Sequence, residues 1–201
     1  MDELDLLKKD WKKNDSKFPE VSEQEIYAML HKKSSSIVKW IFVISIIEFI
    51  VLNSLSLLLP NDFDSKLGWV NTFVAYADYV SYAVAAFFIY LFYKNFQSIS
   101  STATTKKLME SILKTRKTVT YYIFFNIAYV FLAGLLIIFS QIKMLLIDTH
   151  QEIKVIIGAS ILLLVLLLAI ILIVWLFYRL IYGFLLKRLH KNFEELKKID
   201  L

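Results

Sequence analysis

VIIGASILLLVLLLAIILIVWLFY, residues 155–178, is the stretch that decides the fold. Its 24 residues include no charged side chain, and only Gly158 and Ser160 fall outside the apolar set. A helix of this length extends about 36 Å, which is enough to cross a hydrocarbon layer of roughly 30 Å. A protein of 201 residues has no interior that could enclose such a helix on all sides. We therefore expect residues 155–178 to span a membrane.

Three further apolar stretches are long enough to cross a bilayer. They cover residues 37–59, 69–93 and 119–140. The chain is 58% hydrophobic with four Gly and two Pro, which is too apolar for a soluble domain and too poor in turn residues for a β-barrel. Helices satisfy their own backbone hydrogen bonds in lipid. The sequence thus predicts an all-α polytopic membrane protein with a four-helix transmembrane domain over residues 37–181.

Residues 1–36 form a polar segment whose first helix carries an apolar stripe. Leu4, Leu7 and Trp11 occupy positions i, i+3 and i+7, which places them on one helical face. Eight Lys and eight acidic residues within residues 1–39 make the segment zwitterionic, unlike a polybasic lipid clamp. We expect the stripe to bind a protein surface, either on this chain or on a cytoplasmic protein partner.

Other segments outside the apolar stretches also have helical signals. Ser22 and Glu25 have the spacing of a capping box, so a second helix is expected to begin here and to run toward the first span. A Ser/Thr-rich turn and an amphipathic helix near the membrane surface are expected within residues 94–118. Residues 182–201 keep an apolar stripe, which predicts a helical tail continuous with the fourth span. That stripe consists of Leu185, Leu189, Phe193 and Leu196.

The basic residues are distributed unequally between the two sides of the predicted membrane domain. Twenty of the 23 Lys and Arg lie within residues 1–39, 94–118 and 179–201, which are the N-terminal segment, the middle connector and the C-terminal tail with the adjoining ends of the spans. Cytoplasmic segments of membrane proteins carry such an excess. Both termini and the middle connector are therefore expected in the cytoplasm. Because the net charge of +5 follows this topology, we expect no nucleic acid partner.

Two carboxyl groups fall inside predicted spans. Glu48 and Asp78 are costly at the centre of a bilayer and are therefore candidates for function. A rise of about 1.5 Å per residue places Glu48, Tyr82 and Tyr129 in one layer, and Asp78 and Asn53 in a second. We expect Glu48 to be hydrogen-bonded to Tyr82 or Tyr129. Asp78 is expected to have its own polar partner or to reach water from the outer side.

Polar and small residues follow one face of each of the first three spans, which indicates the side turned toward other helices. On the second span this face comprises Asn71, Ala75, Asp78, Tyr82 and Ala86. The predicted intramembrane polar network comprises Glu48, Tyr82, Tyr129, Asp78, Asn53 and Asn126. Burial favours the neutral form of Glu48, which would serve either as a proton relay or as a structural group. Gly134 and Gly158 are predicted sites of close helix packing.

Residue types that several enzyme classes need are absent or separated. The chain has no Cys, which excludes thiolate nucleophiles and thiolate metal sites. His31 and His190 are predicted on the cytoplasmic side and His150 on the other side. No zinc-protease or phosphate-binding motif occurs. We expect no catalytic residue, no metal and no cofactor, and hence a protein that is not an enzyme.

The opening DELDLLKKDWKK, residues 2–13, followed by EIYAMLHKKSSSIVKW, residues 25–40, resembles an uncharacterised family of small bacterial four-span membrane proteins. Its members look like candidate membrane-bound anti-sigma factors. The resemblance implies that residues 1–36 contact a cytoplasmic partner such as a sigma factor, with the apolar stripe as the anchor. It also implies a location in the bacterial cytoplasmic (inner) membrane.

Two functions are consistent with these patterns. The leading hypothesis is a membrane-anchored regulatory or scaffold protein that binds a cytoplasmic partner through its cytoplasmic helices. The alternative is a small ion- or proton-coupled transporter component that uses Glu48 and Asp78. The lipid bilayer is the expected surrounding in both cases, and the sequence leaves open association of the chain into a homo-oligomer.

Overall fold

The computed structural model describes residues 22–58, 68–102, 104–148 and 152–199. These residues form four α-helices: α2 (Glu23–Leu58), α3 (Gly68–Ser100), α4 (Thr105–Asp148) and α5 (Ile153–Ile199). The all-α fold is thus confirmed for the described part of the chain. By length and composition, each of the four helices is able to cross a membrane. The predicted helix that carries Leu4, Leu7 and Trp11 lies outside the described residues.

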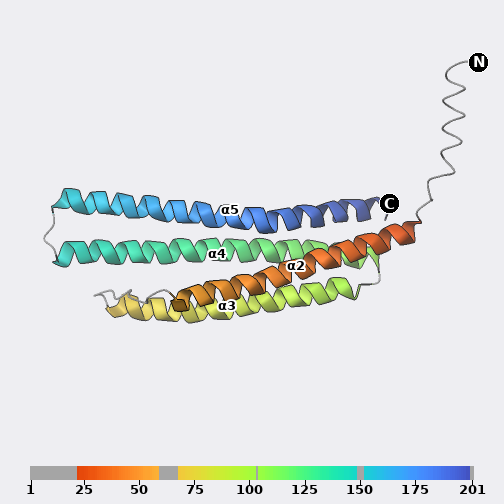
Figure 1. Cartoon of the computed structure of the whole chain (residues 1–201), viewed down its shortest axis with the longest axis horizontal. Helices are drawn as coiled ribbons and strands as arrows, with labels where there is room; N and C mark the ends of the chain where they lie inside the picture. Colours follow the sequence, from red (N-terminus) through yellow and green to blue (C-terminus); the bar gives the residue numbers. More distant parts are fainter. Residues whose placement is uncertain (1–21, 59–67, 103, 149–151, 200–201) are drawn as a thin grey trace, which may run out of the picture.

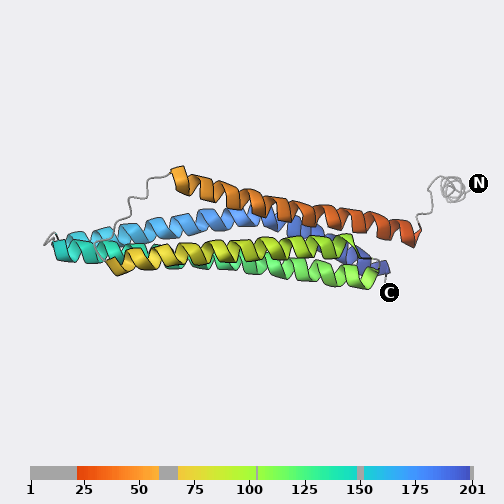
Figure 2. The same cartoon turned by 90° about the horizontal axis from the view of Figure 1, so that it is seen from below.

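The four helices lie side by side along one axis (Figure 1). Helix α2 packs against α3 and α5, and α4 packs against α3 and α5. Figure 2 shows α2 crossing the other three helices at an angle. The start of α2, the end of α3, the start of α4 and the end of α5 lie together at one end of the bundle. We call this end the basic end, because most of the described Lys and Arg residues lie toward it.

Each predicted span lies within one helix, and the helices are longer than the spans. Helix α4 begins at Thr105, so the predicted amphipathic helix is the first part of α4. The predicted turn between α3 and α4 and the predicted helix after it are thus confirmed, and the helix is continuous with the third predicted span. Leu108 and Ile112, the apolar residues that suggested it, are fully buried against other helices, so their apolar face packs on protein.

The start of α2 follows the predicted capping box. The Ser22 backbone N–H donates to Glu25 Oε2 over 3.0 Å, and the Glu25 N–H donates to Ser22 Oγ over 3.3 Å. These bonds satisfy two backbone donors that the first turn of a helix leaves without partners. From Glu23 the helix continues without a break into the first predicted span. The local sequence signal therefore sets where α2 begins.

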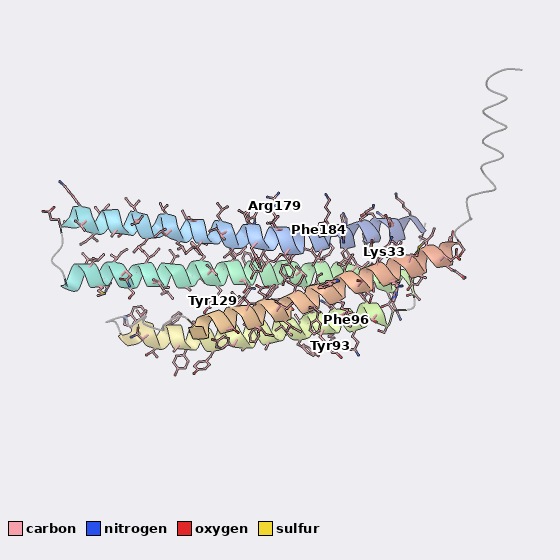
Figure 3. The ribbon with its side chains drawn as sticks, in the orientation of Figure 1. Lys33, Tyr93, Phe96, Tyr129, Arg179 and Phe184 are labelled. Atoms are coloured by element: carbon pink, nitrogen blue, oxygen red, sulfur yellow. The ribbon has the colours of Figure 1, made fainter. Side chains whose placement is uncertain are left out.

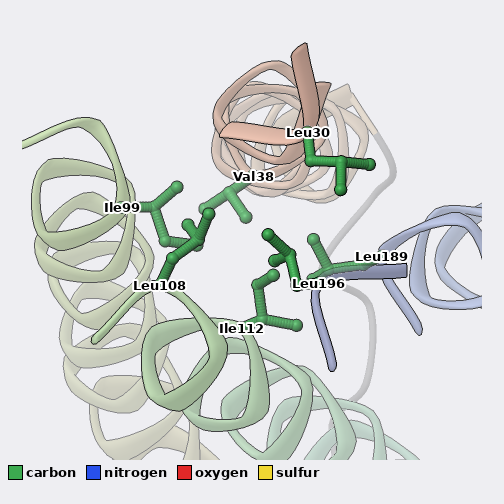
Figure 4. Packing of buried hydrophobic residues seen from close by; sticks show 7 residues of the cluster. All are labelled: Leu30, Val38, Ile99, Leu108, Ile112, Leu189 and Leu196. Carbon is green, nitrogen blue, oxygen red and sulfur yellow. The ribbon is translucent and has the colours of Figure 1, made fainter. Parts of the chain in front are cut away.

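A hydrophobic core fills the basic end, and all four helices contribute to it (Figure 4). The predicted stripe of the C-terminal tail is confirmed, because Leu189 and Leu196 are fully buried in this core. Burying one such side chain away from water is worth about 1.5–3 kcal/mol. The tail therefore packs as the fourth helix of the bundle. The basic-end core consists of Leu30, Val38, Ile99, Leu108, Ile112, Leu189 and Leu196.

Helices α4 and α5 approach closely in the middle of the bundle. A Cβ atom added to Gly134 would lie 2.2 Å from Leu167 Cδ1, so the predicted close packing at Gly134 is confirmed. The same prediction for Gly158 is wrong, since a Cβ there would meet no atom within 4 Å. Gly158 lies near the start of α5, among neighbours such as Ile157 that are largely exposed in the single chain.

Candidate functional site

The Glu48 carboxyl of α2 is buried inside the bundle with 9% of its side chain exposed. The Tyr178 hydroxyl of α5 donates to Glu48 Oε1, and the Tyr182 hydroxyl donates to Oε2 over 3.0 Å. Residues four apart on a helix share a face, so α5 presents both hydroxyls to one carboxyl group. A buried polar group without partners costs several kcal/mol, and here both carboxyl oxygens have a donor. We call Glu48, Tyr178 and Tyr182 the carboxyl–tyrosine cluster.

Aromatic rings from the other two helices enclose this cluster. Tyr122 of α4 has its ring centroid 6.1 Å from that of Tyr178 and 6.0 Å from that of Tyr182, both in edge-on geometry. Phe88 and Phe92 of α3 contact Tyr122 at 5.3 and 5.4 Å. Such edge-to-face pairs are each worth about 0.5–1.5 kcal/mol beyond their buried area. All four helices therefore meet around one carboxyl group.

The expected partners of Glu48 are wrong. We expected Tyr82 or Tyr129, and the structure places Tyr178 and Tyr182 on the carboxyl group. Tyr178 is the last residue of the fourth predicted span, a position at which an aromatic ring commonly anchors a helix in the membrane interface. Helix α5 instead lies displaced along the bundle axis, so that the end of its apolar stretch is level with Glu48.

Asp78 lies on the exposed side of α3 and has a partner on α4, as expected. The Tyr129 hydroxyl donates to Asp78 Oδ1 over 3.0 Å. In Figure 3, Tyr129 lies on α4 far from Lys33, which marks the basic end. Tyr82, which we expected beside Glu48, has 43% of its side chain exposed. The two acids of the predicted spans therefore have different tyrosine partners from different helices.

Of the two predicted asparagines, only Asn126 has a described side chain, and it lies next to Tyr122 beside the carboxyl–tyrosine cluster. Asn126 donates from Nδ2 to the backbone carbonyl of Tyr122 over 2.9 Å, one turn earlier on its own helix. The side chain of Asn53 lies outside the described residues. The single network predicted from the sequence is thus replaced by the carboxyl–tyrosine cluster and by the Asp78–Tyr129 pair.

Most of the predicted polar face of α3 is exposed in the single chain, although Asn71 is half-buried and Asp78 reaches Tyr129 of α4. Ala75, Asp78, Tyr82 and Ala86 are all exposed in the single chain. Toward the basic end α3 packs through large apolar residues such as Phe88 and Phe92, and nearer its start the half-buried residues of this helix include the small Ala77, Ser81 and Ala85. The buried residues on this packing face are Val70, Phe88, Phe92, Asn95 and Ile99.

Near the basic end, α2 supplies hydrogen bonds to one carbonyl in the last turn of α3 and to one just beyond its end. The Tyr27 hydroxyl donates to the Thr102 carbonyl over 3.2 Å, and His31 Nε2 lies 2.8 Å from the Ile99 carbonyl, to which its N–H donates. The last carbonyls of a helix have no partner within the helix. These contacts join the first turns of α2 to the α3–α4 turn. These contacts could not be predicted from the sequence, because a Tyr and a His at i and i+4 give no sign of a distant partner.

Two further polar pairs are buried at the basic end. Asn192 of α5 donates to Ser34 Oγ of α2 over 3.1 Å, and Asn95 of α3 donates to Thr118 Oγ1 of α4 over 3.1 Å. A buried amide that loses its partner costs about 1–3 kcal/mol. The pairs therefore favour one register between α2 and α5 and one register between α3 and α4.

The predicted partner-binding residues lie outside the described part of the chain. Leu4, Leu7 and Trp11 precede the first described residue. Within residues 22–58, 68–102, 104–148 and 152–199, no three His, Asp or Glu side chains are grouped to hold a metal ion.

These features define an all-α protein with four helices that are apolar enough to cross a membrane and with a buried carboxyl group at their centre. The chain belongs to the family described as Domain of unknown function (DUF8845), whose model matches residues 24–201. No curated protein matches the chain. No solved structure matches it.

Proposed function

We propose that the protein is a membrane-anchored regulatory or scaffold protein that binds a cytoplasmic partner, such as a sigma factor, through its cytoplasmic helices. In this proposal the chain lies in the bacterial cytoplasmic membrane, with the basic end and both termini in the cytoplasm. The observation that supports this proposal is the hydrophobic core at the basic end. Four helices that continue beyond their apolar stretches and pack around seven apolar side chains provide a rigid surface for a soluble partner.

The contacts of α2 give a route by which partner binding would act on the membrane domain. Residues 1–21 lead into α2, whose Tyr27 and His31 bind the end of α3. Farther along the same helix, Glu48 is held by Tyr178 and Tyr182 of α5. A displacement of α2 at its first turn would therefore strain hydrogen bonds to two other helices. The proposed role of α2 is to connect the binding segment to the bundle.

The partner-binding stripe is tested with the full-length protein and matched leucine variants. The protein is purified in a mild detergent from the cells that contain it, and co-purifying cytoplasmic proteins are quantified. Leu7→Ala removes one residue of the stripe, whereas Leu6→Ala removes the neighbouring leucine, which lies on another face of the predicted helix. We expect recovery of one cytoplasmic protein to fall at least about fivefold in Leu7→Ala, which is about 1 kcal/mol of binding.

Recovery should be unchanged in Leu6→Ala, and Trp11→Ala should behave like Leu7→Ala. Equal recovery from the wild type and from Leu7→Ala would overturn the assignment of the stripe. A partner that remains bound after deletion of residues 1–21 would show instead that the described bundle itself forms the binding surface.

A second candidate function, proton or ion coupling, is favoured by the burial of Glu48. Intramembrane carboxyl groups mark proton pathways in many transporters. The different tyrosine partners of Glu48 and Asp78 argue against a single relay through both acids. Proton uptake into liposomes that contain the purified protein tests the candidate. Uptake abolished by Glu48→Gln and retained in Asp78→Asn would support Glu48 as the coupling group, and uptake no faster than in empty liposomes would contradict it.

A further inference from the structure

Helix α3 carries an exposed seam with the spacing of a coiled coil. Its residues are separated alternately by four and three positions, so they repeat every 3.5 residues on average, which is the repeat of a left-handed helix pair. All six are exposed in the single chain, and Tyr79 is 71% exposed. We call them the α3 seam: Gly68, Thr72, Ala75, Tyr79, Tyr82 and Ala86.

The exposed side of α5 serves as a comparison, because it has the composition expected of a helix surface that contacts lipid. The outer side of α5 presents aliphatic side chains that are each more than half exposed. Acyl chains gain nothing from Gly, Ala, Thr or tyrosine hydroxyls, whereas close helix packing in membranes favours them. The α3 seam is therefore composed for contact with a helix rather than with lipid. The α5 residues compared are Ile161, Leu162, Val165, Leu168 and Leu172.

Asp78 lies directly beside the α3 seam and is exposed with it. A carboxylate has about four acceptor positions, and the Tyr129 hydroxyl uses one of them. An acid that faces bare acyl chains is costly, so such residues face a protein interior or a water-filled space. The bundle of one chain leaves this acid on its outer surface.

We propose that the α3 seam binds the α3 seam of a second copy of this chain. Copies inserted with the same orientation bring their α3 helices together in parallel, and a two-fold axis along the membrane normal places the same surface on both sides of the contact. In this packing each seam side chain enters a hole formed by four residues of the facing helix. The hole for Tyr79 of the second copy is bounded by Ala75, Asp78, Tyr79 and Tyr82.

The residues around that hole are complementary to a tyrosine. Ala75 leaves space for the ring, and Asp78 offers a carboxylate oxygen to the phenol hydroxyl of Tyr79 of the second copy. By symmetry the same contact occurs twice. The seam from Gly68 to Ala86 extends about 27 Å, close to the roughly 30 Å of a hydrocarbon layer. The pairing thus covers the acids and the tyrosine hydroxyls along the depth of the membrane.

Disulfide cross-linking in membranes tests the pairing, because the wild-type chain has no cysteine and each variant carries a single thiol. Ala75→Cys places the thiol in the seam. Ala77→Cys is a matched control, because it changes the same residue type two positions away, on a side of α3 that is half-buried against the bundle. Ile161→Cys on the exposed side of α5 reports random collisions. The full-length variants are oxidised in native membranes and separated without reductant.

We expect a cross-linked dimer for Ala75→Cys at least about tenfold more abundant than for Ala77→Cys or Ile161→Cys, because a disulfide needs Cα atoms within about 7 Å. An Ala75→Cys yield no greater than that of Ile161→Cys would overturn the proposal. Cross-linking of Ala75→Cys to a different protein, with no dimer formed, would also overturn it.

A second measurement avoids dependence on thiol chemistry. Donor- and acceptor-labelled chains are reconstituted in liposomes, and energy transfer is followed as lipid is added. Ala75→Leu fills the space for the tyrosine at an exposed position, so the single chain should keep its fold. We expect half-maximal transfer to need at least about fivefold more protein per lipid in Ala75→Leu than in the wild type, a change of about 1 kcal/mol. Identical dilution curves would contradict pairing through the α3 seam.

Discussion

Glu48 and Asp78 are both carboxyl groups of apolar helices, and their surroundings are opposite. Glu48 is 9% exposed, its two oxygens accept hydrogen bonds from two tyrosines of α5, and rings of α3 and α4 enclose them. Asp78 is exposed on α3 and accepts one hydrogen bond from Tyr129. The carboxyl group of Glu48 therefore joins helices within one chain. The carboxyl group of Asp78 remains exposed, and in our proposal it also contacts a second copy of the chain.

The largest expected effect comes from removing the buried acid. Glu48→Ala leaves the Tyr178 and Tyr182 hydroxyls buried without their acceptor and opens a cavity, which should lower the free energy of unfolding by about 3 kcal/mol. The measurement is unfolding by SDS in mixed micelles, in a detergent that keeps the chain monomeric. Asp78→Ala is the matched control, and it should lower the value by no more than about 0.5 kcal/mol, the usual limit for surface positions. Equal losses would remove the contrast between the two acids.

The tyrosine donors of Glu48 give a smaller effect. Tyr182→Phe keeps the ring that packs on Tyr122 and removes one hydroxyl, so we expect the free energy of unfolding to fall by about 1.5 kcal/mol, the upper end of the usual range for a hydrogen bond within a protein. The same unfolding assay measures it. Tyr121→Phe, at an exposed position of α4, controls for the chemical change alone. A Tyr182→Phe protein as stable as Tyr121→Phe would show that the hydroxyl does not serve Glu48.

The smallest effect is expected for the partner of Asp78. Tyr129→Phe removes a single hydrogen bond whose acceptor, Asp78, is exposed on the surface of the monomer, and it should lower the free energy of unfolding by about 0.5 kcal/mol, the lower end of the range for a hydrogen bond. The measurement compares the free energies of unfolding of Tyr129→Phe and Tyr182→Phe in one SDS titration series. A loss larger than that of Tyr182→Phe would reverse the assignment of the inner and the outer acid.

The sequence predicts the helices well because the signals for them are local. The uncharged run 155–178 lies within α5, the Ser22–Glu25 capping box starts α2, and the tail stripe that contains Leu189 and Leu196 is buried where helical periodicity places it. Each of these features depends on residues within a few turns of one another, so no knowledge of the other helices is needed.

The partners of the two acids could not be predicted in the same way, because they depend on how helices slide and rotate against one another. Helix α5 has almost no polar residue in its apolar run to indicate which face is inward, and Tyr178 had an equally good explanation as an interfacial anchor. The polar face of α3 was assigned to the inside by a rule that holds for an assembled protein. That rule does not distinguish a neighbouring helix of the same chain from one of a second copy.

The most direct test of the buried carboxyl–tyrosine cluster is a double-mutant cycle between Glu48 and Tyr182 in the unfolding assay. The structure predicts that Glu48→Ala and Tyr182→Phe are strongly non-additive, with a coupling free energy of about 1 kcal/mol or more, because both changes remove the same 3.0 Å hydrogen bond. Additivity within about 0.3 kcal/mol, the behaviour of distant independent sites, would contradict it.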